Sequence, residues 1–187
     1  MRKLVVTEFL SLDGVFQAPG PDGSGFKYEG WTFAYNDQDF MTFKMDELKA
    51  SDMLLLGRVT YDGFAKAWPK MSGDEFSDKF NSMPKYVVSS TLKKADWNNS
   101  HIISTNVVEE IQKLKEEDGG DIAVHGSGQL IRFLTEHKLV DQFNLLVYPI
   151  VLGQGKKLFE GTPKTELKLI DSAAFSTGVM KLIYQPK

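Results

Sequence analysis

Three polar segments follow short apolar runs, and each carries groups that can bind a phosphate. The first, Gly57-Arg58-Val59-Thr60, combines a glycine that permits a sharp turn with a permanent cation at the start of a helix. The second, Ser89-Ser90-Thr91, offers three hydroxyls to a phosphate or a ribose. The third, His125-Gly126-Ser127-Gly128-Gln129-Leu130, has small residues that would let a phosphate reach the amides of a helix N-terminus. Each is also typical of an ordinary turn or helix start, so the interpretation depends on whether the fold brings them together.

Three carboxylates are further candidates for chemistry. Asp13 lies in an Asp13-Gly14 turn at the end of the first predicted strand, where it could orient a substrate or relay a proton. Asp37 and Asp39 stand at the start of a predicted helix, where acidic side chains commonly just stabilise the helix dipole. Asp13 is therefore the preferred candidate for a catalytic role.

The composition excludes several classes of chemistry. The absence of cysteine rules out disulfides, thiolate zinc sites, iron–sulfur clusters and cysteine nucleophiles. The three histidines, His101, His125 and His137, lack the spacing of a zinc motif, so no metal site is expected. No G-x-S-x-G elbow or P-loop occurs. Gly153-Gln154-Gly155-Lys156-Lys157 resembles a phosphate loop but follows a long strand, and we interpret it as a structural turn.

Length and charge predict the general type of protein. A chain of 187 residues predicts a single domain spanning 1–187. The net charge of −3 gives no electrostatic reason to expect nucleic-acid binding. No apolar stretch approaches the ~18 residues of a membrane span, so we expect a cytoplasmic protein without a membrane partner.

The chain order predicts alternating strands and helices, followed by strands alone. The first strands are expected at 3–12, 53–56, 85–89, 101–104 and 122–125. Helices are expected from an Asn36 cap to about Ala50, after a Ser72–Glu75 capping box, from an Asn106 cap to Gly119, and from Gly128 through Leu134. Three long strands, 142–151, 166–172 and 175–185, complete the pattern. Together they predict an α/β fold with one mixed sheet flanked by helices.

Two details of this pattern bear on function. The predicted helix at 36–50 would face the sheet with five apolar side chains: Phe40, Met41, Phe43, Met45 and Leu48. The Pro- and Gly-rich segment 16–31 is long for a loop within a compact domain, which suggests a lid. Because open α/β sheets bind ligands at the carboxyl ends of their strands, the three phosphate-type segments would align along one edge.

In this order the motifs resemble the dihydrofolate-reductase-like superfamily, specifically the branch with the reductase domain of the riboflavin-biosynthesis deaminase–reductase. The similarity covers essentially the whole chain. It implies a three-layer α/β fold: a mostly parallel eight-stranded sheet with antiparallel C-terminal strands and helices on both faces. The motifs are Ser11-Leu12-Asp13-Gly14, Gly57-Arg58-x-Thr60-Tyr61, Val87–Thr91, Val124–Leu130, and Val140-Asp141 through Pro149-x-Val151-Leu152-Gly153-x-Gly155.

The resemblance also implies NADPH as the hydride donor. Carried over by position, Gly57, Arg58 and Thr60 would hold the pyrophosphate and the 2′-phosphate end. Ser89, Ser90 and Thr91 would line the adenosine phosphate site. The diphosphate and the nicotinamide ribose would lie on Gly126, Ser127, Gly128, Gln129 and Leu130. Asp13 and Gly14 would lie beside the nicotinamide and the substrate, with Asp39 as a further substrate contact.

Two departures from the family pattern disfavour folate as the substrate. Asp39-Phe40-Met41-Thr42-Phe43-Lys44 matches the Asp-x-x-x-Phe-Lys of a dihydrofolate reductase, but Glu47 replaces the threonine expected further along. No arginine occurs in 62–85 to clamp a folate carboxylate.

The prediction is therefore an NADPH-dependent reductase of a small heterocyclic or carbonyl/imine substrate, such as the ribosylaminopyrimidine of riboflavin biosynthesis. The alternatives are a dihydrofolate reductase and a non-catalytic nucleotide-binding protein. A homodimer is expected, because the C-terminal strands, especially 175–185, would leave an edge to protect.

Overall fold

All eight strands belong to one sheet, in the computed structural model that describes residues 1–187. The strand order is β4-β3-β2-β5-β1-β6-β8-β7. The first six in this order are parallel, β8 is antiparallel to β6, and β7 is antiparallel to β8. This confirms the mixed, mostly parallel sheet with an antiparallel C-terminal part. The strands are β1 (Leu4–Ser11), β2 (Ser51–Gly57), β3 (Lys85–Val88), β4 (Ser100–Ile103), β5 (Asp121–His125), β6 (Gln142–Tyr148), β7 (Leu167–Ala174) and β8 (Met180–Pro186).

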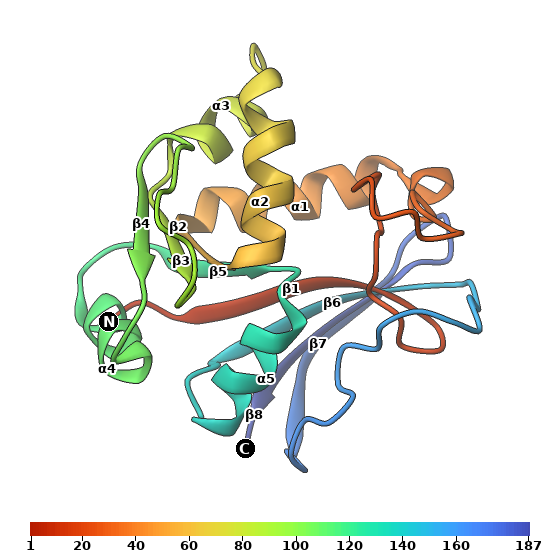
Figure 1. The fold of residues 1–187 in the computed structure, drawn as a ribbon. Helices are drawn as coiled ribbons and strands as arrows, with labels where there is room; N and C mark the ends of the chain where they lie inside the picture. The colour runs from red at the N-terminus through yellow and green to blue at the C-terminus, as the bar shows by residue number, and fades with distance from the viewer.

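Helices cover both faces of the sheet, which gives the expected three layers. In Figure 1, α1, α2 and α3 lie above the sheet, and α4 and α5 lie below it. No helix is long and apolar enough to cross a membrane. The helices are α1 (Gln38–Ala50), α2 (Arg58–Ala67), α3 (Glu75–Ser82), α4 (Val107–Glu116) and α5 (Gly128–Glu136), with two short 3₁₀ turns, η1 (Phe33–Tyr35) and η2 (Trp68–Lys70).

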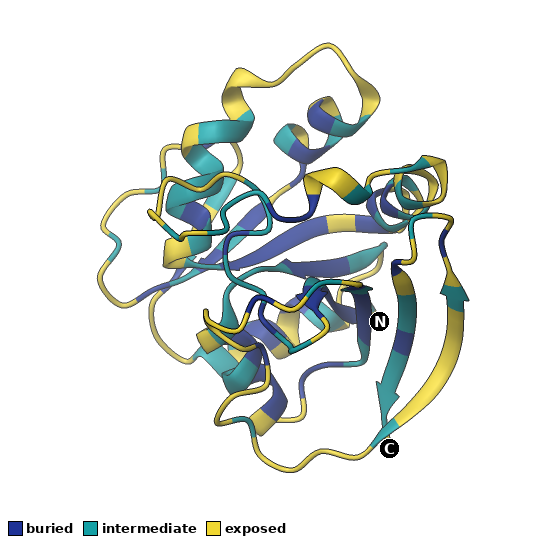
Figure 2. Ribbon diagram, turned by 90° about the vertical axis from the view of Figure 1, so that its right-hand side faces the viewer, coloured by how far each residue is buried: buried dark blue, intermediate teal, exposed yellow.

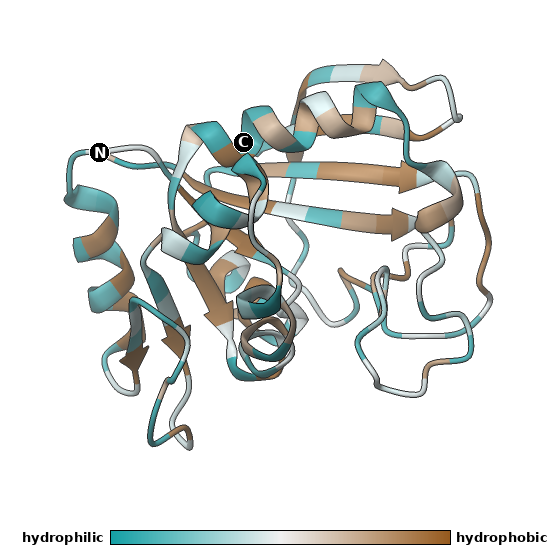
Figure 3. Ribbon diagram, turned by 90° about the horizontal axis from the view of Figure 1, so that it is seen from above, coloured by the Kyte–Doolittle hydropathy of each residue, from teal (hydrophilic) through white to brown (hydrophobic).

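The central strands form because they are apolar on both faces, and each face packs on a separate layer of helices. Figure 3 shows these strands largely in brown, and Figure 2 shows the same strands largely buried. Below the sheet, Val6 and Leu55 pack with Ile111 of α4 and Leu134 of α5. Burial on two faces is the usual reason that parallel strands are continuously hydrophobic.

Three helices begin within one or two residues of their predicted starts, but their caps differ from expectation. Helix α1 is capped by Asp37, whose carboxylate accepts the Phe40 N–H at 2.8 Å, and not by Asn36. Helix α3 is capped by Asp74, which accepts the Ser77 N–H at 2.9 Å, so the Ser72–Glu75 capping box is wrong. Asn106 does precede α4, but in a left-handed conformation and without a side-chain cap. In the first two cases a neighbouring aspartate reaches the free amides instead.

The inward face of α1 also differs from the prediction. Leu48 is buried as expected, but Met41 is 51% exposed and Lys44 is buried in its place. A buried lysine is stable only if its charge is matched. Glu47 supplies that match at 2.5 Å from the Lys44 ammonium.

Two of the three C-terminal strands, β6 and β8, are shorter than predicted, and the edge of the sheet is a different strand. A turn occupies the start of the expected strand at 175–185, since Phe175 N–H donates to the Val179 carbonyl and Gly178 has φ +84°. The remaining strand, β8, lies between β6 and β7, so β7 is the edge. Figure 2 shows this edge strand largely exposed.

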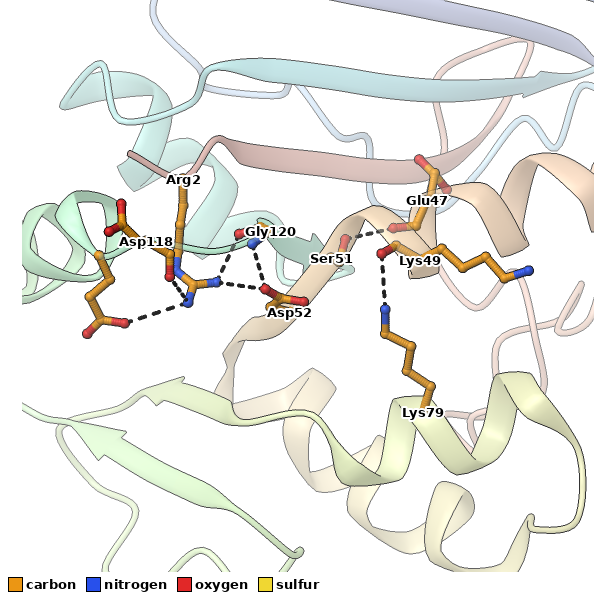
Figure 4. A network of polar contacts seen from close by, with 9 residues as sticks. Arg2, Glu47, Lys49, Ser51, Asp52, Lys79, Asp118 and Gly120 are labelled. Atoms are coloured by element: carbon orange, nitrogen blue, oxygen red, sulfur yellow. Dashed lines mark hydrogen bonds and ion pairs between the residues drawn. The ribbon is translucent and has the colours of Figure 1, made fainter.

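At the amino ends of the strands, Arg2 fixes the loop before β5. Its guanidinium donates to the carbonyls of Gly120 at 2.9 Å and Asp118 at 2.8 Å, and pairs with Asp52 at 3.5 Å (Figure 4). Gly119 has φ +141°, and a Cβ there would lie 2.4 Å from the Arg2 guanidinium. Arg2 therefore has a structural role at the amino ends of the strands. Arg132 donates to the Glu160 carbonyl. Arg58 is the remaining arginine, and it lies at the carboxyl ends of the strands.

Candidate functional site

The connections of the central strands change from one face of the sheet to the other on each side of β5. Helices α1 and α2, which follow β1 and β2, lie on the upper face, whereas α5, which follows β5, lies on the lower face (Figure 1). Ligands of open α/β sheets bind at such switch points, outside the carboxyl ends of the strands. The three phosphate-type segments predicted from the sequence follow β2, β3 and β5 at this edge.

Ser127 joins the turn after β5 to the turn after β2. Its hydroxyl accepts the Gly57 N–H at 2.9 Å and donates to the His125 carbonyl at 3.1 Å. Its own N–H donates to the Thr60 hydroxyl at 2.9 Å. Two of the three segments are therefore cross-linked directly, through residues more than 60 positions apart in the chain.

Arg58 joins the same turn to the third segment, after β3. Its guanidinium donates to the Thr91 hydroxyl at 2.6 Å and pairs with Asp62 at 3.4 Å. Ser89 is buried, and its hydroxyl accepts the amides of Thr91 and Leu92, so it shapes this turn. All three segments thus meet, as the alignment along one edge predicts.

Two glycines allow the close approach of these turns. Gly126 has φ +56°, and a Cβ there would lie 2.8 Å from the Thr60 hydroxyl. A Cβ on Gly128, the first residue of α5, would lie 2.5 Å from the ring of Phe16. The predicted lid segment 16–31 therefore contacts the N-terminus of α5 through Phe16. Its other end is tied back by the Trp31 indole, which donates to the Gln17 carbonyl at 2.9 Å.

Several groups at this edge remain available to a ligand. Ser90, Thr91 and Gln129 are exposed, and the Arg58 side chain is 49% exposed. Val59 is 83% exposed, which is unusual for an apolar residue at the start of a helix. Leu130 differs from expectation, because its side chain is buried in the core and leaves only its backbone at the edge.

Asp13 holds the end of β1 against the loop after β6. Its carboxylate accepts the Ser11 hydroxyl at 2.7 Å and the amides of Leu152 at 3.1 Å and Gly153 at 2.9 Å. These bonds, the Ser11 hydroxyl first, lower the pKa of Asp13 to about 2. A carboxylate with this pKa is ionised at neutral pH and is poorly suited to donating a proton.

The loop 153–157 is a structural turn, as interpreted from the sequence. Phe16 N–H donates to the Lys156 carbonyl at 3.0 Å, and Leu158 N–H donates to the Gly14 carbonyl at 3.1 Å. A Cβ on Gly155 would lie 2.6 Å from Val15. The loop therefore packs on the strand β1 exit and has no free glycine-rich cradle.

The other two carboxylates have separate roles. Asp37 caps α1 and accepts the Ser176 hydroxyl at 2.6 Å, and these bonds lower its pKa. Asp39 is exposed in the first turn of α1 and forms no hydrogen bond within the chain. Its expected contact with a substrate stays a prediction.

The sequence did not reveal a buried polar cluster beneath α1. Lys44 donates to Thr7 at 2.9 Å and to Glu47 at 2.5 Å, and Asn144 donates to Glu47 at 2.6 Å. Together with His125 these residues line a cavity of about 190 Å³ between α1, α3 and the sheet. Burial lowers the pKa of His125 well below its usual value, and Lys44 adds to this effect.

The sequence model of the RibD C-terminal domain family matches residues 2–181. The chain belongs to this family. It is also 31% identical over 188 residues to the uncharacterized protein YyaP of Bacillus subtilis (strain 168), covering 98% of this chain and 94% of YyaP. Membership confirms the resemblance drawn from the motifs.

Two solved structures show how widely the fold of this RibD C-terminal domain is shared. A "Putative riboflavin biosynthesis protein" from Shewanella sp. PV-4 has a TM-score of 0.77 at 19% identity, over 99% of both chains. The dihydrofolate reductase of Enterococcus faecalis, complexed with NADP(H) and RAB-propyl, has a TM-score of 0.63 at 15% identity, over 99% of this chain and 96% of that one. At these identities the likeness establishes the dihydrofolate-reductase-like fold.

Asp13→Asn should destabilise the RibD C-terminal domain at neutral pH. Because folding lowers the pKa of Asp13 from 3.8 to about 2, its contribution is present above pH 4 and is lost as the pH falls to 2. Discounted for solvent screening, the expected loss is about 1 kcal/mol at pH 7. Urea unfolding at pH 7, 4 and 2 measures it, with the exposed Asp39→Asn as control. Equal stability of Asp13→Asn and the parent at pH 7 would contradict this role.

Proposed function

We propose that this RibD C-terminal domain is an NADPH-dependent reductase of a small heterocyclic carbonyl or imine substrate. Its reaction would resemble the reduction of 5-amino-6-(5-phosphoribosylamino)uracil in riboflavin biosynthesis. The observation that carries the proposal is the meeting of the Gly57, Thr91 and Ser127 segments at the switch point. Family membership supports the same class of activity.

The residues at this edge fit a dinucleotide. Helix α5 begins at Gly128, and its first amides lie at this edge, where they suit a diphosphate. Arg58 and the hydroxyls of Ser90 and Thr91 lie together at the far end, where they suit a 2′-phosphate. When bound, the nicotinamide supplies the hydride, and this chain orients it and excludes water.

The cavity beneath α1 is the proposed site of the hydride acceptor. Its volume is about 190 Å³, and a cavity of about 150 Å³ holds one benzene ring. It therefore suits a single six-membered ring with small substituents. The Lys44–Glu47 pair is already neutral, and no arginine lines the cavity, so it offers no clamp for a folate glutamate. Folate therefore remains the disfavoured alternative.

A non-catalytic nucleotide-binding protein is the second candidate. One observation favours it. Asp13, the predicted proton relay, accepts three hydrogen bonds from groups of this chain, so it has no proton to donate to a substrate. NADPH oxidation in the presence of pterins, aminopyrimidines, quinones and aldehydes separates the two. Tight NADPH binding without turnover of any acceptor would favour the non-catalytic function.

A thermal-shift panel tests the cofactor. NADPH at 100 times its dissociation constant should stabilise the domain by about 2.7 kcal/mol. For a chain of this size that corresponds to a rise in Tm of roughly 5–10 °C. NADH, FMN and folate serve as comparisons. A clear shift with FMN and none with NADPH would contradict the proposal.

Arg58→Ala should weaken NADPH binding more than NADH binding. Removing a charge-assisted hydrogen bond costs about 1.5–3 kcal/mol, which corresponds to a rise in Kd of roughly tenfold or more. NADH lacks the 2′-phosphate, so its Kd should change little. Fluorescence titration of both cofactors measures the difference, with Arg132→Ala as the matched control away from the three segments. Equal losses for NADPH and NADH would show that Arg58 does not select the phosphate.

We also propose a homodimer that covers the β7 edge. Leu169 and Ile170 lie at a bulge in this edge strand, and both are nearly half exposed. A monomer would leave an unpaired, partly apolar edge in water. Light scattering at micromolar concentration should give a mass near twice the chain mass of 21.0 kDa. A mass near 21.0 kDa would contradict the dimer.

A further inference from the structure

Glu8 is a buried acid on β1, level with the turn that leads into α5. Thr7 pairs with His125 in the sheet register, so Glu8 is the next residue along β1 and lies level with Gly126, where β5 turns into α5. The residue is only 5% exposed, and its Oε1 has no hydrogen-bond partner. No role described so far uses this carboxyl group.

The charges around Glu8 leave it without a counter-ion. Lys44 is the one buried cation nearby, and it is bonded to Glu47 and Thr7. Glu47 accepts three donors, from Lys44, Thr7 and Asn144, whereas Oε1 of Glu8 accepts none. A buried charge without a partner is costly, so burial favours the neutral form of Glu8.

The pKa of Glu8 agrees with this charge count. Burial raises it well above its usual value, and the negative charge of Glu47 adds to the rise. Lys44 and the Gly126 amide oppose the rise without cancelling it. Burial therefore favours the neutral form of Glu8 beneath the turn that leads into α5.

We propose that Glu8 controls diphosphate binding at the Gly126–Gly128 turn: as a neutral acid it permits binding, and as a carboxylate it repels the phosphates. The inference rests on the proposed dinucleotide site and adds a regulation of it by pH. A negative charge beneath the first turn of α5 would offset the positive end of the helix dipole that attracts the phosphates. Dinucleotide affinity should therefore fall as Glu8 loses its proton.

The other groups around Glu8 do not produce this dependence. On α1, Lys44 and Glu47 form a neutral pair, and on β5, His125 stays neutral because burial lowers its pKa. Arg132 of α5 is occupied with the Glu160 carbonyl. Lys85 has a pKa of about 8, but it begins β3 at the opposite edge of the sheet, where it bonds the Asn98 carbonyl.

The test compares the parent, Glu8→Gln and Glu116→Gln by NADPH fluorescence titration between pH 6 and 9. The parent Kd should rise with pH as Glu8 loses its proton. Glu8→Gln has the size of the neutral acid, so its Kd should stay constant and match the parent value at pH 6. Glu116 is an exposed acid at the end of α4, away from both proposed sites, so Glu116→Gln should follow the parent.

The outcomes separate this inference from the proposed function. If the parent and Glu8→Gln share the same pH dependence, or if the parent has none, the role of Glu8 is overturned and the cofactor assignment stands. If no NADPH binds at any pH, both are overturned.

A measurement on the parent alone covers the case in which Glu8→Gln does not fold. Calorimetry of NADPH binding in two buffers with different heats of ionisation counts the protons taken up. Between pH 8 and 9 the 2′-phosphate is fully ionised, so it contributes no uptake. Proton uptake that grows with pH supports the inference, and zero uptake at both values overturns it.

Discussion

The contact between Ser127 and the start of α2 is the interaction on which the candidate site depends. It is made by two hydrogen bonds, from Gly57 N–H to the Ser127 hydroxyl and from Ser127 N–H to the Thr60 hydroxyl, both 2.9 Å long. Neither turn could approach the other with a side chain at Gly126. The contact brings two helix N-termini together at one edge, where their amides and dipoles favour an anion.

The two edges of the sheet are built for different purposes. At the amino edge, the Arg2 guanidinium donates to the Asp118 and Gly120 carbonyls and so holds the loop before β5 (Figure 4). At the carboxyl edge, the Arg58 side chain is half exposed and donates to the Thr91 hydroxyl. A ligand could accept from Arg58 in place of Thr91 or in addition to it. A scaffold fixed at one end and open at the other positions loops for binding.

The sequence predicted the sheet and the three phosphate-type segments because the signals for both are local. Each segment follows a short apolar run, and glycine marks the turn at Gly57 and Gly126. The helix caps were harder, since Asn36 and Asp37 are both good caps and only the fold decides between them. The edge was wrongly expected at 175–185, because the pairing of β8 with β6, which leaves β7 outermost, is a long-range feature of the fold.

The buried polar cluster could not be predicted, because its partners are distant in the chain. Thr7 and Glu8 interrupt an apolar strand, and Asn144 interrupts another, but nothing local says what they meet. Their partner Glu47 lies 40 residues from Thr7 and 97 from Asn144. From the sequence, Glu47 is only a departure from the family pattern. In the structure it is the residue that accepts hydrogen bonds from Thr7, Lys44 and Asn144.

The most direct test of this account is to map where NADPH binds by amide NMR of the ¹⁵N-labelled chain. The account predicts that the largest shifts occur at Gly57–Thr60, Ser90–Thr91 and Gly126–Gln129, the three segments that meet at the carboxyl edge. Shifts concentrated around Arg2 and Gly120 at the amino edge, with these segments unaffected, would contradict it.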